Sequence, residues 1–227
     1  DFLERVTVRR GGQAYSVSWA GRDRYFEQRL AGDLAGPHDL FEGDVHRLLG
    51  AMLPPGTPVV FASSLAVRDA DWFMPRRKEP LLPFSQRGAN GIDGILSLAR
   101  GVAAGSSQGT VLVTGDLAFL HDSNGLLGAS ADRHGLLVLL LNNEGGGIFD
   151  FLPVAAKTGA YERLFATPQK VGFKQLVEAH GGCHAAVGGI EELEPLLAQW
   201  DGVGLTVLEV GIDRQASRAL HRHYLGG

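Results

Sequence analysis

Two short polar clusters in this chain contain residue types that can bind a divalent cation. Gly115-Asp116-Leu117 directly follows the apolar run 110–114, and Asn142-Asn143-Glu144-Gly145-Gly146-Gly147 directly follows the apolar run 136–141. Carboxylate and amide oxygens suit a hard cation such as Mg²⁺, and glycines let the backbone approach a ligand closely. The pattern therefore indicates a cation that holds a diphosphate.

The spacing of these clusters predicts that they meet at one edge of a β-sheet. About one strand–helix–strand unit separates them, so the two apolar runs are expected to be neighbouring parallel strands. Ligands of open α/β sheets bind outside the carboxyl ends of the strands. Each cluster alone also has a structural interpretation, since Gly-Asp can be a turn and helix cap, asparagine can satisfy a turn, and a glycine run can be a hinge. Together they favour the cation site.

A third cluster, residues 85–94, reads Ser-Gln-Arg-Gly-Ala-Asn-Gly-Ile-Asp-Gly. Its glycine spacing is a weak phosphate signal and also fits helix–sheet packing. Arg87 in this cluster, and Arg68 after Ser63-Ser64, stand at predicted strand-to-helix junctions. One such arginine is usually a surface residue, but two suit an anionic substrate. His121-Asp122 is not expected to be a catalytic dyad, because adjacent side chains of a helix do not face each other.

Alternating strand-like and helix-like segments surround these clusters. Strands are predicted at 59–62, 81–85, 110–114, 136–141, 184–187 and 205–210. Helices are predicted at 39–53, 91–105, 122–131, 173–180, 190–200 and 215–224, with a long irregular segment at 153–168. The runs 110–114 and 136–141 are continuously apolar, as strands covered on both faces are. The pattern predicts an α/β fold with a doubly wound, mainly parallel sheet of six strands.

The first 36 residues differ from the rest and are expected to be the tail of a preceding domain plus a linker. Residues 6–8 and 14–19 resemble short strands, and 22–34 a charged helix. Residues 37–227 are expected to form one domain. Because the chain starts at Asp1 without Met, we expect a fragment of a longer protein.

The bulk composition narrows the class of protein. The 227 residues are 44% hydrophobic and 20% charged, with a formal net charge of −4. No polyanionic partner is indicated, and the absence of a basic stripe with interleaved aromatics argues against nucleic acid. The longest apolar run, 135–141, is too short to span a membrane. With no signal-peptide pattern and a single Cys183, a cytoplasmic location is expected.

Four segments together resemble the thiamine-diphosphate-dependent enzymes. They are residues 63–68, 86–94, 115–117 and 142–153. Most members of that family carry Gly-Asp-Gly, whereas this chain has Gly-Asp-Leu, as does a synthase subfamily of menaquinone and phylloquinone biosynthesis. The resemblance covers residues 36–225, and more loosely the first 35. It implies the thiamine-diphosphate-binding fold, with residues 37–227 as the diphosphate-binding domain and residues 1–36 as a remnant of the central domain.

The resemblance implies a role for each matched residue. The cation, Mg²⁺ or Mn²⁺, would be held by Asp116, Asn143 and the carbonyl of Gly145. Thiamine diphosphate would be bound by Ile92, Gly115, Leu117, Ala118, Gly146, Ile148 and Phe149. Substrate carboxylates would be bound by Ser64, Arg68 and Arg87, with Leu152 lining the pocket.

The implied reaction is decarboxylation of 2-oxoglutarate, followed by addition of the succinyl carbanion to isochorismate. In this family the glutamate that activates the cofactor's pyrimidine ring belongs to an N-terminal domain, and no position here matches it. No catalytic residue is therefore assigned, and the chain alone is expected to be inactive. Family active sites form between subunits, which implies a homodimer or homotetramer. Gln86 and Glu144 stand where the family commonly has asparagine, and we expect them to tune contacts.

Two alternatives remain open. The first is another thiamine-diphosphate enzyme, of the acetolactate synthase or 2-oxoacid decarboxylase type. Arg68 and Arg87 argue against it by favouring a dicarboxylate donor. The second is a non-catalytic, Rossmann-like module that binds a nucleotide or phosphate.

Overall fold

The structure, a computed structural model, describes residues 13–34 and 36–225. Contacts divide the chain into two compact units, Asp1–His38 and Asp39–Gly227. The division falls close to the boundary expected after residue 36.

The first unit contains one described helix, α1 (Gln13–Asp33). The strand expected at 14–19 is wrong, because those residues lie in this helix. Tyr15 and Trp19 are four residues apart and pack edge to face with ring centroids 6.1 Å apart, which is the contact that helical spacing produces. The strand expected at 6–8 lies outside the described residues. Within the described part of the chain, no helix combines the length and apolarity that a membrane crossing requires.

The second unit is built on a six-stranded sheet in which all neighbouring strands are parallel. The strand order is β2-β1-β3-β4-β6-β5. The strands are β1 (Pro58–Phe61), β2 (Leu82–Phe84), β3 (Thr110–Gly115), β4 (Leu136–Asn142), β5 (Cys183–Val187) and β6 (Leu205–Gly211). The predicted six-stranded α/β sheet is confirmed, and its strands are parallel throughout.

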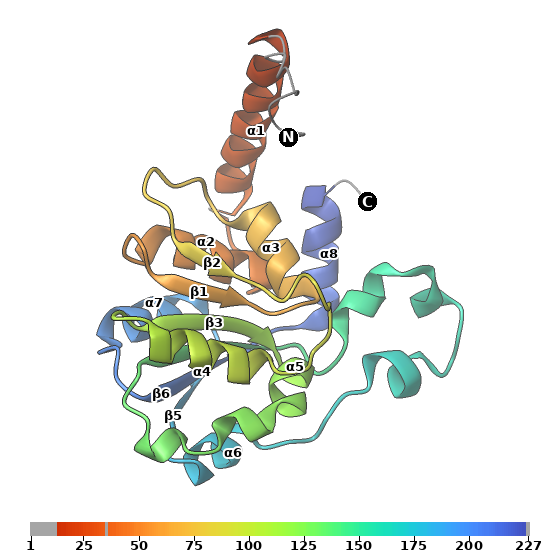
Figure 1. The fold of residues 1–227 in the computed structure, drawn as a ribbon. Coiled ribbons are helices and arrows are strands. Elements are labelled where there is room, and N and C mark those ends of the chain that lie inside the picture. The colour runs from red at the N-terminus through yellow and green to blue at the C-terminus, as the bar shows by residue number, and fades with distance from the viewer. Residues whose placement is uncertain (1–12, 35, 226–227) are drawn as a thin grey trace, which may run out of the picture. The chain divides into compact units, whose positions relative to one another are not determined.

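Helices cover both faces of this sheet (Figure 1). They are α2 (Glu42–Met52), α3 (Leu65–Phe73), α4 (Ile95–Gly105), α5 (Asp116–His121), α6 (Phe173–Ala179), α7 (Ile190–Gln199) and α8 (Arg214–Leu225). Helix α2 contacts α3 and α7, while α4 contacts β1, β3 and β4. Since parallel crossovers are right-handed, the strand order places α3 and α7 on one face and α4, α5 and α6 on the other. The sheet is therefore doubly wound, as predicted.

The two central strands are the most buried part of the fold. Every residue from Thr110 to Thr114 and from Leu136 to Leu141 is buried. Their continuous apolar sequence follows from being covered by helices on both faces. This buried centre fixes the positions of the strand ends, where the polar clusters begin.

Two segments between the strands differ from expectation. The helix predicted at 122–131 is wrong: α5 ends at His121, and only short 3₁₀ turns follow, at Ser123–Leu126 and Ala129–Ala131. Gly128 has a φ of +77°, a conformation that interrupts any continuous helix there. The segment predicted to be irregular at 153–168 contains a 3₁₀ turn at Pro153–Ala156 and a π-helical turn at Glu162–Ala166.

Candidate functional site

The polar clusters meet at the carboxyl edge of the sheet. Gly115 at the end of β3 pairs with Leu141 of β4, so Asp116 and Asn143 follow neighbouring strand ends. From β1 the chain builds β2 on one side and then returns to build β3 on the other. This reversal of direction is the switch point at which α/β sheets bind ligands.

A cavity of about 360 Å³ opens at this edge. Its walls come from five segments: Glu42, 63–68, 87–92, 115–118 and 141–149. The structure brings together thirteen of the residues that the sequence singled out, namely Ser64, Arg68, Arg87, Ile92, Gly115, Asp116, Leu117, Ala118, Asn143, Gly145, Gly146, Ile148 and Phe149. Residues from four different loops therefore share one cavity.

Leu152 is the predicted pocket residue that does not line this cavity. A 3₁₀ turn, Gly147–Phe151, ends immediately before it, and the Leu152 side chain is half exposed. The turn carries the chain past the cavity wall before this position is reached.

Asp116 is a buried carboxyl group at the start of α5. Burial raises its pKa to about 6, against opposing hydrogen bonds from the backbone N–H groups of Leu117 and Gly145. Removal from water penalises the ionised form, so the site favours a positive charge beside this carboxylate. A cation that replaces the proton would remove that penalty.

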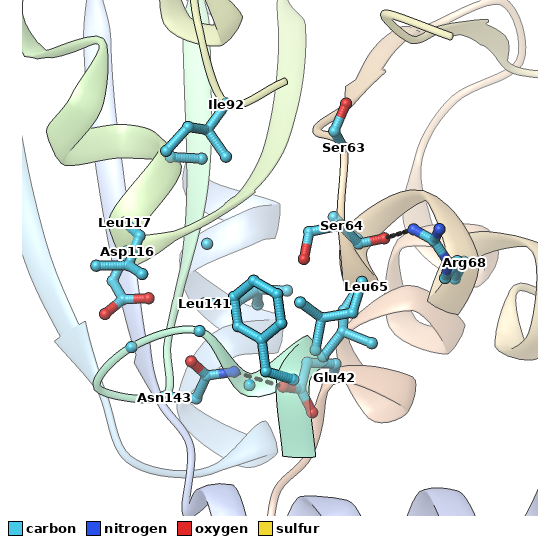
Figure 2. A pocket seen from close by; sticks show the side chains of 18 of the residues that line it. Glu42, Ser63, Ser64, Leu65, Arg68, Ile92, Asp116, Leu117, Leu141 and Asn143 are labelled. Carbon is cyan, nitrogen blue, oxygen red and sulfur yellow. Dashed lines mark hydrogen bonds between the residues drawn. The ribbon is translucent and has the colours of Figure 1, made fainter. Parts of the chain in front are cut away.

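Asn143 presents its amide oxygen on the side of Asp116 (Figure 2). Its amide nitrogen points the other way and donates a hydrogen bond to Oε1 of Glu42 over 3.2 Å. Asp116 and Asn143 thus offer two oxygen donors at adjacent strand ends, a donor set suited to Mg²⁺ or Mn²⁺.

Gly145 occupies a position that only glycine fits. Its φ is +133°, and a Cβ built on it would lie 2.3 Å from the carbonyl oxygen of Ala166. The same carbonyl accepts a hydrogen bond from the N–H of Gly146 over 2.7 Å, which ties the glycine run to the π-helical turn. The Gly145 carbonyl oxygen accepts from the N–H of Gly147 over 3.0 Å.

The opposite wall of the cavity carries serine and arginine side chains. Ser64 has a φ of +79°, which is unusual for a residue other than glycine, at the junction between β1 and α3. A guanidinium N–H of Arg68 donates to the Ser64 carbonyl oxygen and holds this turn (Figure 2). The buried hydroxyl of Ser63 finds no hydrogen-bond partner among the described residues. Arg68 and Arg87 are the two cationic residues among those that line the cavity.

Sequence reasoning missed part of the cavity wall. The additional lining residues are Glu42, Ser63, Leu65, Ala66, Asn90, Gly91, Leu141 and Gly147. All except Glu42 lie inside or next to the clusters that the sequence singled out, so their neighbourhood was a usable signal. Glu42 has no such signal, because it precedes Asn143 by 101 positions and only the fold brings the two together. His121 and Asp122 have separate partners, Asp93 and Ser97, which agrees with the rejection of a dyad.

The chain belongs to a family of cofactor-dependent enzymes. Residues 76–210 match the family described as "Thiamine pyrophosphate enzyme, C-terminal TPP binding domain". The match covers the strand ends that carry Asp116 and Asn143. This chain is therefore a member of the thiamine pyrophosphate enzyme family.

Similar proteins have been named more specifically. A 2-succinyl-5-enolpyruvyl-6-hydroxy-3-cyclohexene-1-carboxylate (SEPHCHC) synthase of Synechococcus sp. (strain JA-3-3Ab) is 44% identical over 89% of this chain and 34% of its own length. The synthase of the same name from Bacillus velezensis is 36% identical over 99% of this chain and 39% of its own length. The chain thus spans little more than a third of these relatives.

The fold is also found in a solved structure. The benzoylformate decarboxylase of Polynucleobacter necessarius superposes with a TM-score of 0.63 at 19% identity, over 76% of this chain and 33% of the other. At that identity the likeness concerns the fold alone.

Proposed function

We propose that this chain is the C-terminal, diphosphate-binding part of a thiamine-diphosphate-dependent SEPHCHC synthase. The complete enzyme would decarboxylate 2-oxoglutarate and join the remaining four-carbon unit to isochorismate, in menaquinone or phylloquinone biosynthesis. The observation that supports this proposal most directly is that one cavity at the carboxyl edge of the sheet is lined by Asp116 and Asn143 and also by Arg68 and Arg87. The names of the relatives support the same reaction.

The residues at the strand ends fit a cation that holds a diphosphate. Asp116 supplies a buried carboxylate and Asn143 an amide oxygen. Gly145 supplies a backbone carbonyl at a position where a Cβ would clash with the Ala166 carbonyl oxygen. Mg²⁺ or Mn²⁺ suits these oxygen donors. Near them, the backbone around Leu117 and Ala118, at the start of α5, would meet the diphosphate.

The remaining lining residues divide into apolar and cationic groups. Ile92, Ile148 and Phe149 would pack against the cofactor's rings. When bound, thiamine diphosphate supplies the electron sink for decarboxylation and carbon–carbon bond formation. Ser64, Arg68 and Arg87 would bind and orient substrate carboxylates, since guanidinium groups match carboxylates in geometry and charge.

Binding experiments test the cofactor proposal against the phosphate-module alternative. Three titrations into the full-length protein are followed by tryptophan fluorescence. The first uses thiamine diphosphate together with Mg²⁺, the second uses NAD, and the third uses ATP. We expect only metal-dependent binding of thiamine diphosphate, and we expect D116A to abolish it because the buried cation ligand is lost. D71A, at an exposed position of α3, is the control and should bind like the unmodified protein. Binding of NAD or ATP without metal would instead favour the alternative.

Substrate preference tests the reaction. Two arginines in one cavity favour a dicarboxylate, so 2-oxoglutarate should be decarboxylated in preference to pyruvate. R87A should raise the KM for 2-oxoglutarate by roughly 10–100-fold, the loss expected for a charge-assisted hydrogen bond. Equal use of pyruvate would favour an acetolactate synthase or 2-oxoacid decarboxylase.

The proposal also includes a homodimer or homotetramer that is located in the cytoplasm. Sedimentation of the full-length protein would test the oligomeric state, and cell fractionation would test the location.

A further inference from the structure

A buried polar network lies behind the cation site, and its first member is Glu42. This residue begins α2, is 1% exposed, and lines the cavity wall. A buried carboxylate without partners would be costly, so each of its oxygens needs a hydrogen-bond donor. One donor is the amide nitrogen of Asn143, 3.2 Å from Oε1.

This contact decides how the Asn143 amide is oriented. Oε1 of Glu42 is the acceptor of this hydrogen bond, so the amide turns its NH₂ group toward Glu42. The amide oxygen then faces away from Glu42 and toward Asp116 (Figure 2). With the amide reversed, two oxygens would oppose each other at Glu42, and the nitrogen would face the cation.

The second oxygen of Glu42 is held from the opposite side of the network. The hydroxyl of Ser217 on α8 donates to Oε2, and Ser217 is itself 4% exposed. Both carboxylate oxygens thus accept hydrogen bonds, from Asn143 and Ser217. The Glu42 side chain is fixed between α8 and the loop that follows β4.

A buried ion pair supports Ser217. His221, one turn further along α8, directs Nδ1 at the Ser217 carbonyl oxygen and Nε2 at Oδ1 of Asp69 on α3, each over 2.9 Å. Both ring nitrogens face acceptors, so both carry protons and the ring is positively charged. Neither His221 nor Asp69 is exposed to solvent. The positive ring compensates the negative charge of Asp69.

We infer that Glu42 is a positioning residue for the cation site: anchored by Ser217, it holds the Asn143 amide with its oxygen toward the cation. The inference rests on the proposed function and deepens it. Groups that orient metal ligands in this way typically contribute 10–100-fold in metal affinity.

The network lies outside the segment of this chain that matches the family. Glu42, Asp69, Ser217 and His221 all fall outside residues 76–210. They reach the site from α2, α3 and α8, which flank the matched segment in the sequence. The orientation of a ligand inside that segment thus depends on elements that precede and follow it.

The first experiment replaces the carboxyl group of Glu42 by an amide in the full-length protein. E42Q keeps the shape of the side chain, so the fold should be retained. We expect the Mg²⁺ concentration for half-maximal thiamine-diphosphate binding, followed by tryptophan fluorescence, to rise roughly 10–100-fold. E192Q, which changes a carboxylate in the first turn of α7, should leave the Mg²⁺ requirement unchanged.

The second experiment exchanges the hydrogen-bond donor and acceptor between positions 42 and 143. In E42Q/N143D the amide lies at position 42 and the carboxylate at 143, so net charge and shape are kept and the NH₂ group again lies between the two side chains. We expect the double variant to recover the Mg²⁺ requirement to within about threefold of the unmodified protein, and to bind Mg²⁺ more tightly than N143D alone. A purely structural role would lower the melting temperature of the metal-free protein without such a recovery.

The outcomes separate this inference from the proposed function. Metal-dependent cofactor binding with an unchanged Mg²⁺ requirement in E42Q overturns the inference alone. The inference alone is also overturned if E42Q/N143D needs as much Mg²⁺ for thiamine-diphosphate binding as the single variant with the higher Mg²⁺ requirement. If the unmodified protein shows no metal-dependent thiamine-diphosphate binding, both the proposed function and the inference fail.

Discussion

At the scale of single residues, Glu144 shows a local cost in the loop that carries the cation ligands. Its φ is +56°, a region that asparagine and glycine tolerate better than glutamate. Its side chain is exposed, and its N–H donates to Oδ1 of Asn142 over 3.1 Å. The family resemblance expected asparagine at this position, and the backbone conformation gives a physical reason for that preference.

Replacement of Glu144 by asparagine should therefore stabilise the protein. We expect E144N to raise the free energy of unfolding by about 0.5–1 kcal/mol, because the backbone strain is reduced while the N–H contact is kept. Urea unfolding followed by circular dichroism measures the change. E144A is the matched control, since alanine is also disfavoured at this φ and should give no gain. An equal gain in both variants would show that strain is not the cause.

Gly145 gives a sharper prediction, because two effects act against any side chain there. A Cβ would lie 2.3 Å from the Ala166 carbonyl oxygen, and φ is +133°. G145A should cost about 2 kcal/mol or more in stability and displace the loop carbonyl from the cation. G101A, within α4 and with no atom near its Cβ, should instead add about 0.5–1 kcal/mol. Thermal unfolding with and without Mg²⁺ and thiamine diphosphate distinguishes the two variants.

The candidate site could be predicted from sequence only where its residues follow strand ends. Asp116 and Asn143 were found because each ends an apolar run, and the parallel sheet then brings the two ends together. Glu42 could not be found, because it lies on a helix 101 positions before Asn143 and its burial depends on packing. Leu152 was placed in the pocket, but a 3₁₀ turn carries it past the wall. Such turns leave little periodicity to recognise.

At the scale of elements, strands were predicted more accurately than helix boundaries. Buried parallel strands such as β3 and β4 are continuous apolar runs, which few other elements produce. The helix expected at 122–131 was wrong because small and polar residues there form 3₁₀ turns that pack against α4. At 14–19, valine, tyrosine and tryptophan favoured a strand, but the surrounding chain continues as the helix α1.

One ion pair links α4 to the turns that replace the expected helix. Oδ2 of Asp132 accepts from Arg100 over 2.9 Å, and Oδ1 accepts from the backbone N–H of His134 over 3.0 Å. Arg100 also donates to the carbonyl oxygen of Gly125 over 2.8 Å. The hydrogen bond from the His134 backbone, followed by that from Arg100, lowers the pKa of Asp132 to about 2. The folded state therefore favours the ionised carboxylate.

This shift gives a pH-dependent stability difference. The usual pKa of Asp132 is 3.8, so its stabilising contribution should be complete above about pH 5 and should be lost as the pH falls from about 4 toward 2. D132N should cost about 1–2 kcal/mol at pH 7, after allowance for solvent screening, and progressively less between pH 5 and pH 3. Urea unfolding of both proteins across this range measures the difference. A difference that does not change with pH would contradict the electrostatic explanation.

At the scale of the whole molecule, the chain spans little more than a third of the length of its named relatives. Its cavity carries the diphosphate-side residues that the family resemblance assigns, while the glutamate that activates the cofactor belongs to another domain in that family. Two carboxyl groups line the cavity: Asp116 accepts backbone hydrogen bonds, and Glu42 accepts hydrogen bonds from Asn143 and Ser217. The proposal therefore places the activating glutamate in a different domain of the complete enzyme from the one that carries this cavity.

We expect the purified 227-residue chain to show no synthase turnover, whereas the full-length protein should convert 2-oxoglutarate and isochorismate with Mg²⁺ and thiamine diphosphate. The physical reason is that the diphosphate side of a site can bind a cofactor without activating it. Carbon dioxide release and product formation by liquid chromatography measure turnover. Circular dichroism and a cooperative thermal transition must first show that the 227-residue chain is folded, so that inactivity is not a result of unfolding. Turnover by the folded chain alone would place the activating group within it, and the assignment of that group to another domain would then be wrong.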